Sequence, residues 1–126
     1  VAAFHSCTSL EDIKISAGVT SIESNVFYGC TSLKHIMIPA SVTSIEQYSF
    51  EGCGALTDVI ICDGLTSIGK EAFCNCQSLE RITIPGSLES VGDRAFKDCF
   101  ALPKPSLRTN VLVGQNAFEN CQTGQN

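Results

Sequence analysis

The chain has 126 residues, of which 44% are hydrophobic and 17% charged, and its net charge is −5 at pH 7. Disordered chains combine low hydrophobicity with high charge, so this composition indicates a folded chain of one-domain length. The negative charge argues against nucleic acid as a partner, because such binding depends on clustered Lys and Arg. No apolar stretch approaches the roughly 18 residues of a spanning helix, so membrane insertion is not expected.

The cysteines recur at a fixed interval, which identifies an internal repeat. Six of the eight are 23 residues apart, or 22 in the last step: Cys7, Cys30, Cys53, Cys76, Cys99 and Cys121. Zinc sites instead pair cysteines two to four residues apart. We therefore predict a single repeat domain over residues 1–126, with a partial unit at 1–6, repeats at 7–29, 30–52, 53–75, 76–98 and 99–120, and a polar tail at 121–126.

Each unit begins with a predicted strand. The segment after the cysteine reads L-x-x-I-x-I, as from Leu33 to Ile38, and this alternation is typical of a half-buried strand. One such strand cannot bury its apolar face alone, so successive units must stack and their strands must form a parallel sheet. At the usual strand spacing of about 4.8 Å, five units would form a slab about 20–25 Å long.

The second half of each unit must return the chain to the next strand. The V-T-S-I segments at 19–22 and 42–45 predict extended or turn structure, and segments such as Lys70 to Phe73 predict a short helical turn. We expect this turn to end in a left-handed backbone, which Gly and Asn tolerate best. The residues at that position are Ser6, Gly29, Gly52, Asn75, Asp98 and Asn120.

The whole pattern, C-x-S-L-x-x-I-x-I-P followed by V-T-S-I and A-F, resembles the 23-residue leucine-rich repeats of the BspA type over residues 4–121. The resemblance implies an α/β solenoid: a right-handed leucine-rich repeat horseshoe or slab with a parallel sheet on the concave side and short turns or helical pieces on the convex side. It also implies a non-catalytic protein-binding module of a cell-surface or secreted adhesin. The expected partner is a host protein or a protein of a neighbouring cell.

Two further columns run through the units. The phenylalanines are expected to stack into a convex-side spine made of Phe4, Phe27, Phe50, Phe73, Phe96 and Phe118. The six repeat cysteines are expected to form a ladder inside the solenoid. A spacing of about 5 Å would permit disulfides, but side chains in register point the same way, so a reduced, buried ladder is favoured. Cys74 shares its column with mostly polar residues and is predicted near the surface as a candidate reactive thiol.

The two ends of the array differ in sequence. The chain opens inside a unit, from Val1 to Phe4, without a polar cap, which suggests excision from a longer repeat protein or a preceding segment. In the fifth unit Pro103 and Pro105 fall in the predicted strand, and proline cannot donate a ladder hydrogen bond. We therefore expect the regular sheet to stop there, with no sixth strand pairing outward beyond residue 107.

The x positions of L-x-x-I-x-I are predicted to face outward from the concave sheet. Met37 and Ile60 are then neighbouring exposed apolar side chains with a charged rim, which is typical of an interaction site. The alternative is that both residues simply suit a strand. The predicted binding patch comprises Lys34, His35, Met37, Asp58, Ile60, Arg81 and Thr83, with Lys34 and Arg81 at the rim.

Metal binding and catalysis are not expected from the same columns. Asp12, His35 and Asp58 would be consecutive, but a nearly flat sheet spreads side chains that a metal site must bring together. No nucleophile motif, phosphate loop or zinc motif occurs, so we expect neither an enzyme nor a cofactor.

Two alternative functions stay open from the sequence: a spacer or stalk without a specific ligand, and an intracellular regulatory scaffold. The charge distribution adds one further expectation. Residues 1–63 carry two basic and seven acidic side chains, whereas residues 64–126 carry six of each. This asymmetry could favour end-to-end self-association.

Overall fold

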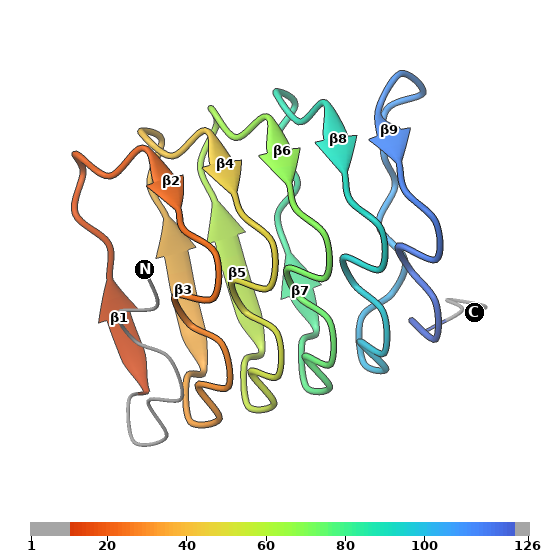
Figure 1. Ribbon diagram of the computed structural model, residues 1–126, viewed down its shortest axis with the longest axis horizontal. Helices are drawn as coiled ribbons and strands as arrows, with labels where there is room; N and C mark the ends of the chain where they lie inside the picture. The colour runs from red at the N-terminus through yellow and green to blue at the C-terminus, as the bar shows by residue number, and fades with distance from the viewer. Residues whose placement is uncertain (1–10, 123–126) are drawn as a thin grey trace.

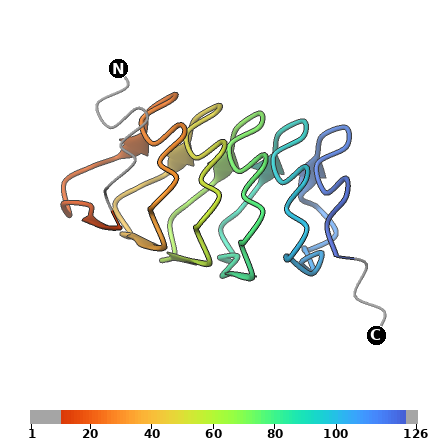
Figure 2. The same ribbon diagram turned by 90° about the horizontal axis from the view of Figure 1, so that it is seen from below.

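The computed structural model describes residues 11–122. The chain winds as a parallel β-solenoid whose successive units lie side by side along one axis (Figure 1). Each of the first four units adds one strand to a first sheet and one short strand to a second sheet. Seen after a rotation of 90°, the units form a row of similar loops (Figure 2).

The first sheet is parallel throughout, with the order β1-β3-β5-β7. Neighbouring strands pair at an offset of 23 residues, so that Ile36 lies beside Val59 and Met37 beside Ile60. Side chains along β3 are alternately exposed and buried, as the alternation in the sequence predicts. The strands are β1 (Asp12–Lys14), β3 (His35–Ile38), β5 (Asp58–Ile61) and β7 (Arg81–Ile82).

The V-T-S-I segments form a second parallel sheet, with the order β2-β4-β6-β8-β9. In β2, β4, β6 and β8 the second residue of the strand is buried. The last strand, β9, lies at the edge of the sheet, and both of its residues are exposed. The strands are β2 (Ser21–Ile22), β4 (Ser44–Ile45), β6 (Ser67–Ile68), β8 (Ser90–Val91) and β9 (Leu112–Val113).

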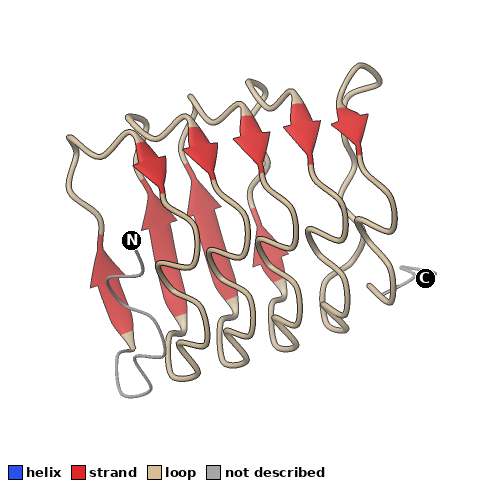
Figure 3. Ribbon diagram, viewed as in Figure 1, coloured by secondary structure: helices blue, strands red, loops and turns tan. Residues whose placement is uncertain are grey.

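In each unit, the segment that follows the strand of the second sheet is a turn, and residues 11–122 contain no helix (Figure 3). The expected helical turn at residues 70–73 is therefore wrong, and so is the α/β class, because the described chain is a β-solenoid. Alternate N–H groups donate to the next unit instead, as Phe50 does to Ala72 at 2.7 Å and Gly52 to Cys74 at 2.9 Å. These groups are then unavailable for the i to i−4 bonds of an α-helix. We call the surface of turns 24–29, 47–52, 70–75 and 93–98 the turn face.

Two residues in each turn have a left-handed backbone. The expected column before the cysteines is confirmed, with φ of 70° at Gly29, 79° at Gly52 and 64° at Asn75. A second column also has positive φ, although it includes residue types that seldom adopt this conformation. Its members are Asn25, Tyr48, Glu71, Arg94 and Asn116. Left-handed residues interrupt the right-handed path that a helix would need.

The phenylalanine rings stack on one another, as the sequence predicts, and the structure places the stack within the core. Neighbouring ring centroids lie 5.0–5.4 Å apart along the series Phe27, Phe50, Phe73, Phe96 and Phe118. Phe50, Phe73 and Phe96 are fully buried and pack with the leucines and isoleucines of both sheets. Three members of the predicted columns, Phe4, Ser6 and Cys7, lie outside the described residues.

The repeat cysteines form a column of hydrogen-bonded thiols. The Sγ atoms of Cys53, Cys76 and Cys99 each donate to the carbonyl of a phenylalanine one unit earlier, at 3.0–3.1 Å. Cys121 makes the equivalent bond at 3.2 Å. All four are free thiols, in agreement with the favoured reduced ladder. Each thiol points at a backbone acceptor, which explains why proximity along the column does not lead to disulfides.

Cys74 is buried, which contradicts its predicted position near the surface. It is only 5% exposed, and burial raises the pKa of its thiol to about 12, with the charges of Glu51 and Glu71 adding to the increase. Carboxylate oxygens of both glutamates lie within 4.8 Å of its Sγ, so the short side chain stays beneath longer neighbours. A buried thiol of high pKa lacks the accessibility and thiolate character of a reactive cysteine.

The first sheet loses its regular ladder in the fifth unit. In the fourth unit the N–H of Glu80 donates to Thr57 at 2.9 Å, but the equivalent residue in the fifth unit is Pro103, which has no N–H. The regular first sheet ends at β7, as expected, and no sixth strand joins it among residues 11–122. Beyond residue 107, Gln122 forms an isolated parallel bridge with Pro103. The N–H of Gln122 donates to Leu102 at 2.9 Å. Proline removes a donor but leaves the neighbouring carbonyls able to accept.

Candidate binding site on the first sheet

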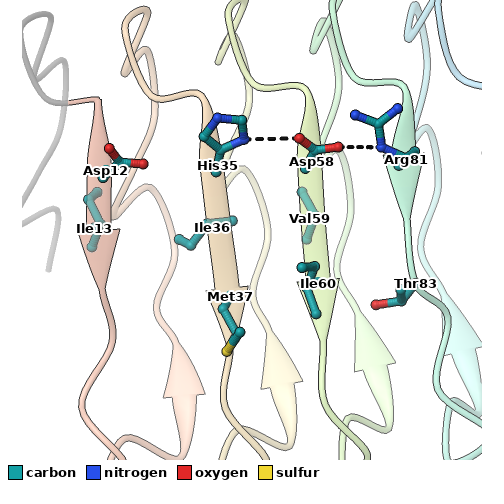
Figure 4. A pocket seen from close by; sticks show the side chains of 10 residues that line it. All are labelled: Asp12, Ile13, His35, Ile36, Met37, Asp58, Val59, Ile60, Arg81 and Thr83. Atoms are coloured by element: carbon teal, nitrogen blue, oxygen red, sulfur yellow. Dashed lines mark hydrogen bonds and ion pairs between the residues drawn. The ribbon is translucent and has the colours of Figure 1, made fainter.

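Two apolar side chains stand on the outer face of the first sheet. Met37 on β3 is 57% exposed and Ile60 on β5 is 47% exposed. They are register partners on adjacent strands, while the residues on either side of them point into the core. Figure 4 shows the pair next to a polar row that contains His35, Asp58 and Arg81. We call the apolar pair and this row, together with Lys34 and Thr83, the sheet patch.

The sheet patch is hollowed. An open cavity of about 570 Å³ extends across the four strands and is lined by Asp12, Ile13, His35, Ile36, Met37, Asp58, Val59, Ile60, Arg81 and Thr83. Pockets for small ligands have volumes of about 300–1,000 Å³, but they enclose most of the ligand surface. A hollow that is open along a sheet instead suits side chains that project from a partner protein.

The polar row is centred on Asp58. His35 Nδ1 lies 2.9 Å from one carboxylate oxygen of Asp58, and Arg81 Nε lies 2.6 Å from the other. The adjacent guanidinium of Arg81 lowers the pKa of Asp58 most, and hydrogen bonds from Thr57 and His35 lower it further. Asp58 is therefore ionised at neutral pH, with its charge balanced by Arg81. Asp12 pairs in register with His35 and extends the row onto β1.

Charged side chains border the patch. Lys34 Nζ lies 3.9 Å from Glu11 Oε1, and Arg81 Nη1 lies 3.4 Å from Glu80 Oε1. More than half of each of these four side chains is exposed. Exposed pairs of this kind contribute only about 0–1 kcal/mol to stability. These charges can therefore exchange their present partners for groups on another protein at little cost.

The predicted patch residues do lie on one surface, but Thr83 has a different role from the others. Its hydroxyl oxygen accepts the N–H of Ile61 at 2.6 Å, so it completes the edge of the sheet. Sequence reasoning missed Asp12 as a lining residue and Thr57 as a donor to Asp58, at 3.1 Å. Asp12 could have been included, because the repeat places it one unit before His35.

The geometry suits binding rather than bond-breaking chemistry. Both carboxylate oxygens of Asp58 already contact His35 or Arg81, so a metal ion would have to displace these groups. The cavity is open to solvent, whereas catalytic sites exclude water around their reacting groups. What the patch offers is apolar area beside a charge-balanced polar row.

Parallel strands in 23-residue register, stacked phenylalanines and helix-free turns define a leucine-rich repeat solenoid. A family model described as the BspA type leucine rich repeat region, with six copies, matches residues 1–124. The chain therefore belongs to the BspA-type leucine-rich repeat family. Among curated proteins, none matches it. Residues 11–122 include no helix of the length and apolarity that crossing a membrane requires.

Solved structures of several bacterial proteins share the fold. A leucine-rich repeat protein from Bacteroides ovatus has a TM-score of 0.78 and 29% identity, over 94% of this chain and 37% of that chain. The T. pallidum leucine rich repeat protein has a TM-score of 0.78 and 32% identity, over 86% of this chain and 53% of that chain. The pneumococcal vaccine antigen PcpA has a TM-score of 0.73 and 25% identity, over 91% of this chain and 33% of that chain. The chain thus spans between a third and about half of their lengths.

Proposed function

We propose that this chain is a non-catalytic protein-binding module of a cell-surface or secreted adhesin, and that the sheet patch is its contact surface. The observation that carries the proposal is the adjacent, exposed pair Met37 and Ile60 over an open cavity of about 570 Å³. The partner is a host protein or a protein of a neighbouring cell. The contact residues are Lys34, His35, Met37, Asp58, Ile60, Arg81 and Thr83.

The apolar pair supplies the attraction. Fully burying an exposed Met or Ile side chain stabilises an association by about 1.5–3 kcal/mol, and Met37 and Ile60 still expose about half of their surface for this purpose. The flexible thioether of Met37 can also adapt to the shape of an incoming side chain. Two such residues side by side form the desolvated centre that binding hot spots require.

The polar row supplies orientation. The side chains of His35 and Arg81 are 58% and 69% exposed, so both can reach a partner while they hold Asp58. Arginine is enriched among the residues that dominate binding energy, and a balanced row of charges selects partners by complementarity. A partner with an apolar anchor and polar groups spaced along a strand would match both halves of the patch.

Membership in this family and the relatives support placement at the cell surface. One relative, PcpA, is a vaccine antigen, and an antigen of this kind must be accessible to antibodies. It is 25% identical to this chain, over 91% of this chain and 33% of PcpA. We extend that exposed location to this chain as part of the proposal.

Binding to immobilised extracellular-matrix proteins and to fixed epithelial and bacterial cells tests the proposal. We expect the wild-type chain to bind at least one of these surfaces. The double variant Met37→Glu with Ile60→Glu should bind that surface at least tenfold more weakly, because two charges replace the apolar centre. Leu112→Glu is the matched control, since Leu112 is 74% exposed but lies on β9, away from the patch.

Thermal melts should show that all three proteins stay folded. Unchanged affinity in the double variant would exclude the sheet patch as the contact surface. A wild-type chain that binds none of the surfaces would favour the spacer function instead.

A further inference from the structure

A thiol and two carboxylates meet on the turn face, away from the sheet patch. The Sγ atom of Cys74 and one carboxylate oxygen each from Glu51 and Glu71 lie within 4.8 Å of one another. Glu51 belongs to the turn at 47–52, whereas Glu71 and Cys74 belong to the next turn at 70–75. The stacking of two consecutive units therefore creates a cluster that neither unit contains alone.

Backbone hydrogen bonds fix this cluster. The carbonyl of Cys74 accepts the N–H of Gly52 at 2.9 Å, which places Glu51 beside Cys74. The N–H of Cys74 donates to the carbonyl of Glu71 at 3.3 Å, so these two residues close one turn. The N–H of Glu71 in turn donates to Asp93 at 2.9 Å. A rigid backbone of this kind is the support that a coordination site needs.

The thiol of Cys74 differs from the other buried thiols of the solenoid. The thiols of Cys53, Cys76 and Cys99 donate to carbonyl oxygens, whereas the Cys74 thiol has no hydrogen-bond partner among residues 11–122. Cys74 is only 5% exposed, so bulk water does not take the place of a partner. Its sulfur lies instead within 4.8 Å of a carboxylate oxygen of Glu51 and one of Glu71.

The surroundings of the cluster are predominantly negative. Burial and the nearby charge of Glu71 raise the pKa of Glu51, and Asp98 adds to the negative charge acting on Cys74. Arg94 Nη1 approaches Glu71 only to 3.8 Å and so compensates the cluster incompletely. A bound dication would relieve the repulsion between these groups.

We propose that Glu51, Glu71 and Cys74 form a binding site for a divalent cation of the zinc class. Zn²⁺ takes thiolate sulfur at about 2.3 Å and carboxylate oxygen at about 2.0–2.2 Å, which gives tetrahedral ligand separations of roughly 3.4–3.6 Å. Binding would require the two glutamate side chains to rotate from separations of up to 4.8 Å to these values. On binding, the thiol proton passes to solvent and a water molecule fills the fourth position.

Titration with Co²⁺ tests the site, because a thiolate ligand gives this ion an intense ultraviolet charge-transfer band. Tetrahedral coordination adds strong visible absorption. We expect the wild-type chain to bind one Co²⁺ with both signals, and Zn²⁺ to abolish them by displacement. A wild-type chain that shows neither signal would overturn the proposal.

Three variants assign the signals to the cluster. Cys74→Ser should abolish the charge-transfer band, and Glu51→Gln should weaken Co²⁺ binding at least tenfold while circular dichroism shows an unchanged fold. Cys62→Ser is the matched control, because Cys62 is a partly buried free thiol outside the cluster and its loss should change nothing. A band that persists in Cys74→Ser, or affinity unchanged in Glu51→Gln, would refute the assignment. Glu51→Gln also decides the matter if Cys74→Ser fails to fold.

Discussion

Replacing Phe50 by Ala removes the central ring of the phenylalanine stack. Phe50 is fully buried, and its ring centroid lies 5.0 Å from the centroids of both Phe27 and Phe73. The planes of the Phe50 and Phe73 rings differ by only 2°. Truncation therefore leaves a cavity bounded by two rings that have lost a neighbour on one side.

The expected loss follows from this geometry. Truncating a buried Phe to Ala typically destabilises a protein by about 3–5 kcal/mol, including the cavity that is left. Two stacking contacts, each worth about 0.5–1.5 kcal/mol, place Phe50 near the upper end of that range. Phe118 is only partly buried and stacks on Phe96 alone, at 5.4 Å, so Phe118→Ala should destabilise by about 1–2 kcal/mol.

Urea unfolding followed by far-ultraviolet circular dichroism measures these differences as changes in the free energy of unfolding. Phe100→Ala serves as a surface control, because Phe100 is 52% exposed and its loss should change stability by less than about 0.5 kcal/mol. Equal losses for Phe50→Ala and Phe118→Ala would refute the view that stacking on both sides stabilises the middle of the solenoid.

Two further predictions concern the backbone and the thiols. Gly92→Ala should destabilise the fold by about 1–3 kcal/mol, because its Cβ would lie 2.6 Å from the backbone nitrogen of Lys70. Gly86→Ala, with nothing within 4 Å of its Cβ, should have the melting temperature of the wild type. Equal melting temperatures for the two variants would contradict this reasoning. Burial raises the pKa of Cys53 from 9.0 to about 12, so the folded state favours the protonated thiol. The contribution of this protonated thiol to the free energy of unfolding is complete below pH 9 and is lost as the pH rises toward 12. In urea unfolding between pH 7 and pH 11, the free energy of unfolding should therefore fall more steeply for the wild type than for Cys53→Ala. Parallel pH dependences for the two proteins would contradict this prediction.

The positions of the first sheet and of the stacked rings follow from the repeat alone. A constant period places equivalent residues one above another, so Ile36 and Val59 occupy the same environment whichever path the rest of the chain takes. The alternation along each strand then decides which side chains are exposed, including Met37 and Ile60. These features depend on pattern, and pattern is visible in the sequence.

The second sheet and the turns depend on contacts between units. A strand as short as Ser44–Ile45 is too short for alternation to reveal it. The left-handed conformations of Tyr48 and Glu71 are not favoured by their residue types. They accompany hydrogen bonds to the next unit, such as Tyr48 to Lys70 at 3.0 Å. Such bonds become evident only once the units are stacked.

Details of the candidate sites depend on the conformations of individual side chains. The column that contains Asp58 and Arg81 predicts that they are neighbours, but not that both oxygens of Asp58 are occupied. Thr83 turns its hydroxyl to the backbone of Ile61, which no column indicates. The burial of Cys74 likewise depends on the length of the side chains around it.

The hydrogen bonds of the repeat cysteines make the solenoid indifferent to redox conditions. Because Cys53, Cys76 and Cys99 are held by carbonyl oxygens and not by sulfur–sulfur bonds, folding needs no oxidant. Their burial also keeps oxidants and reductants away from the sulfur atoms. A stack of such units can therefore keep one architecture in a reducing interior and in an oxidising exterior, without an isomerase to form or repair cross-links.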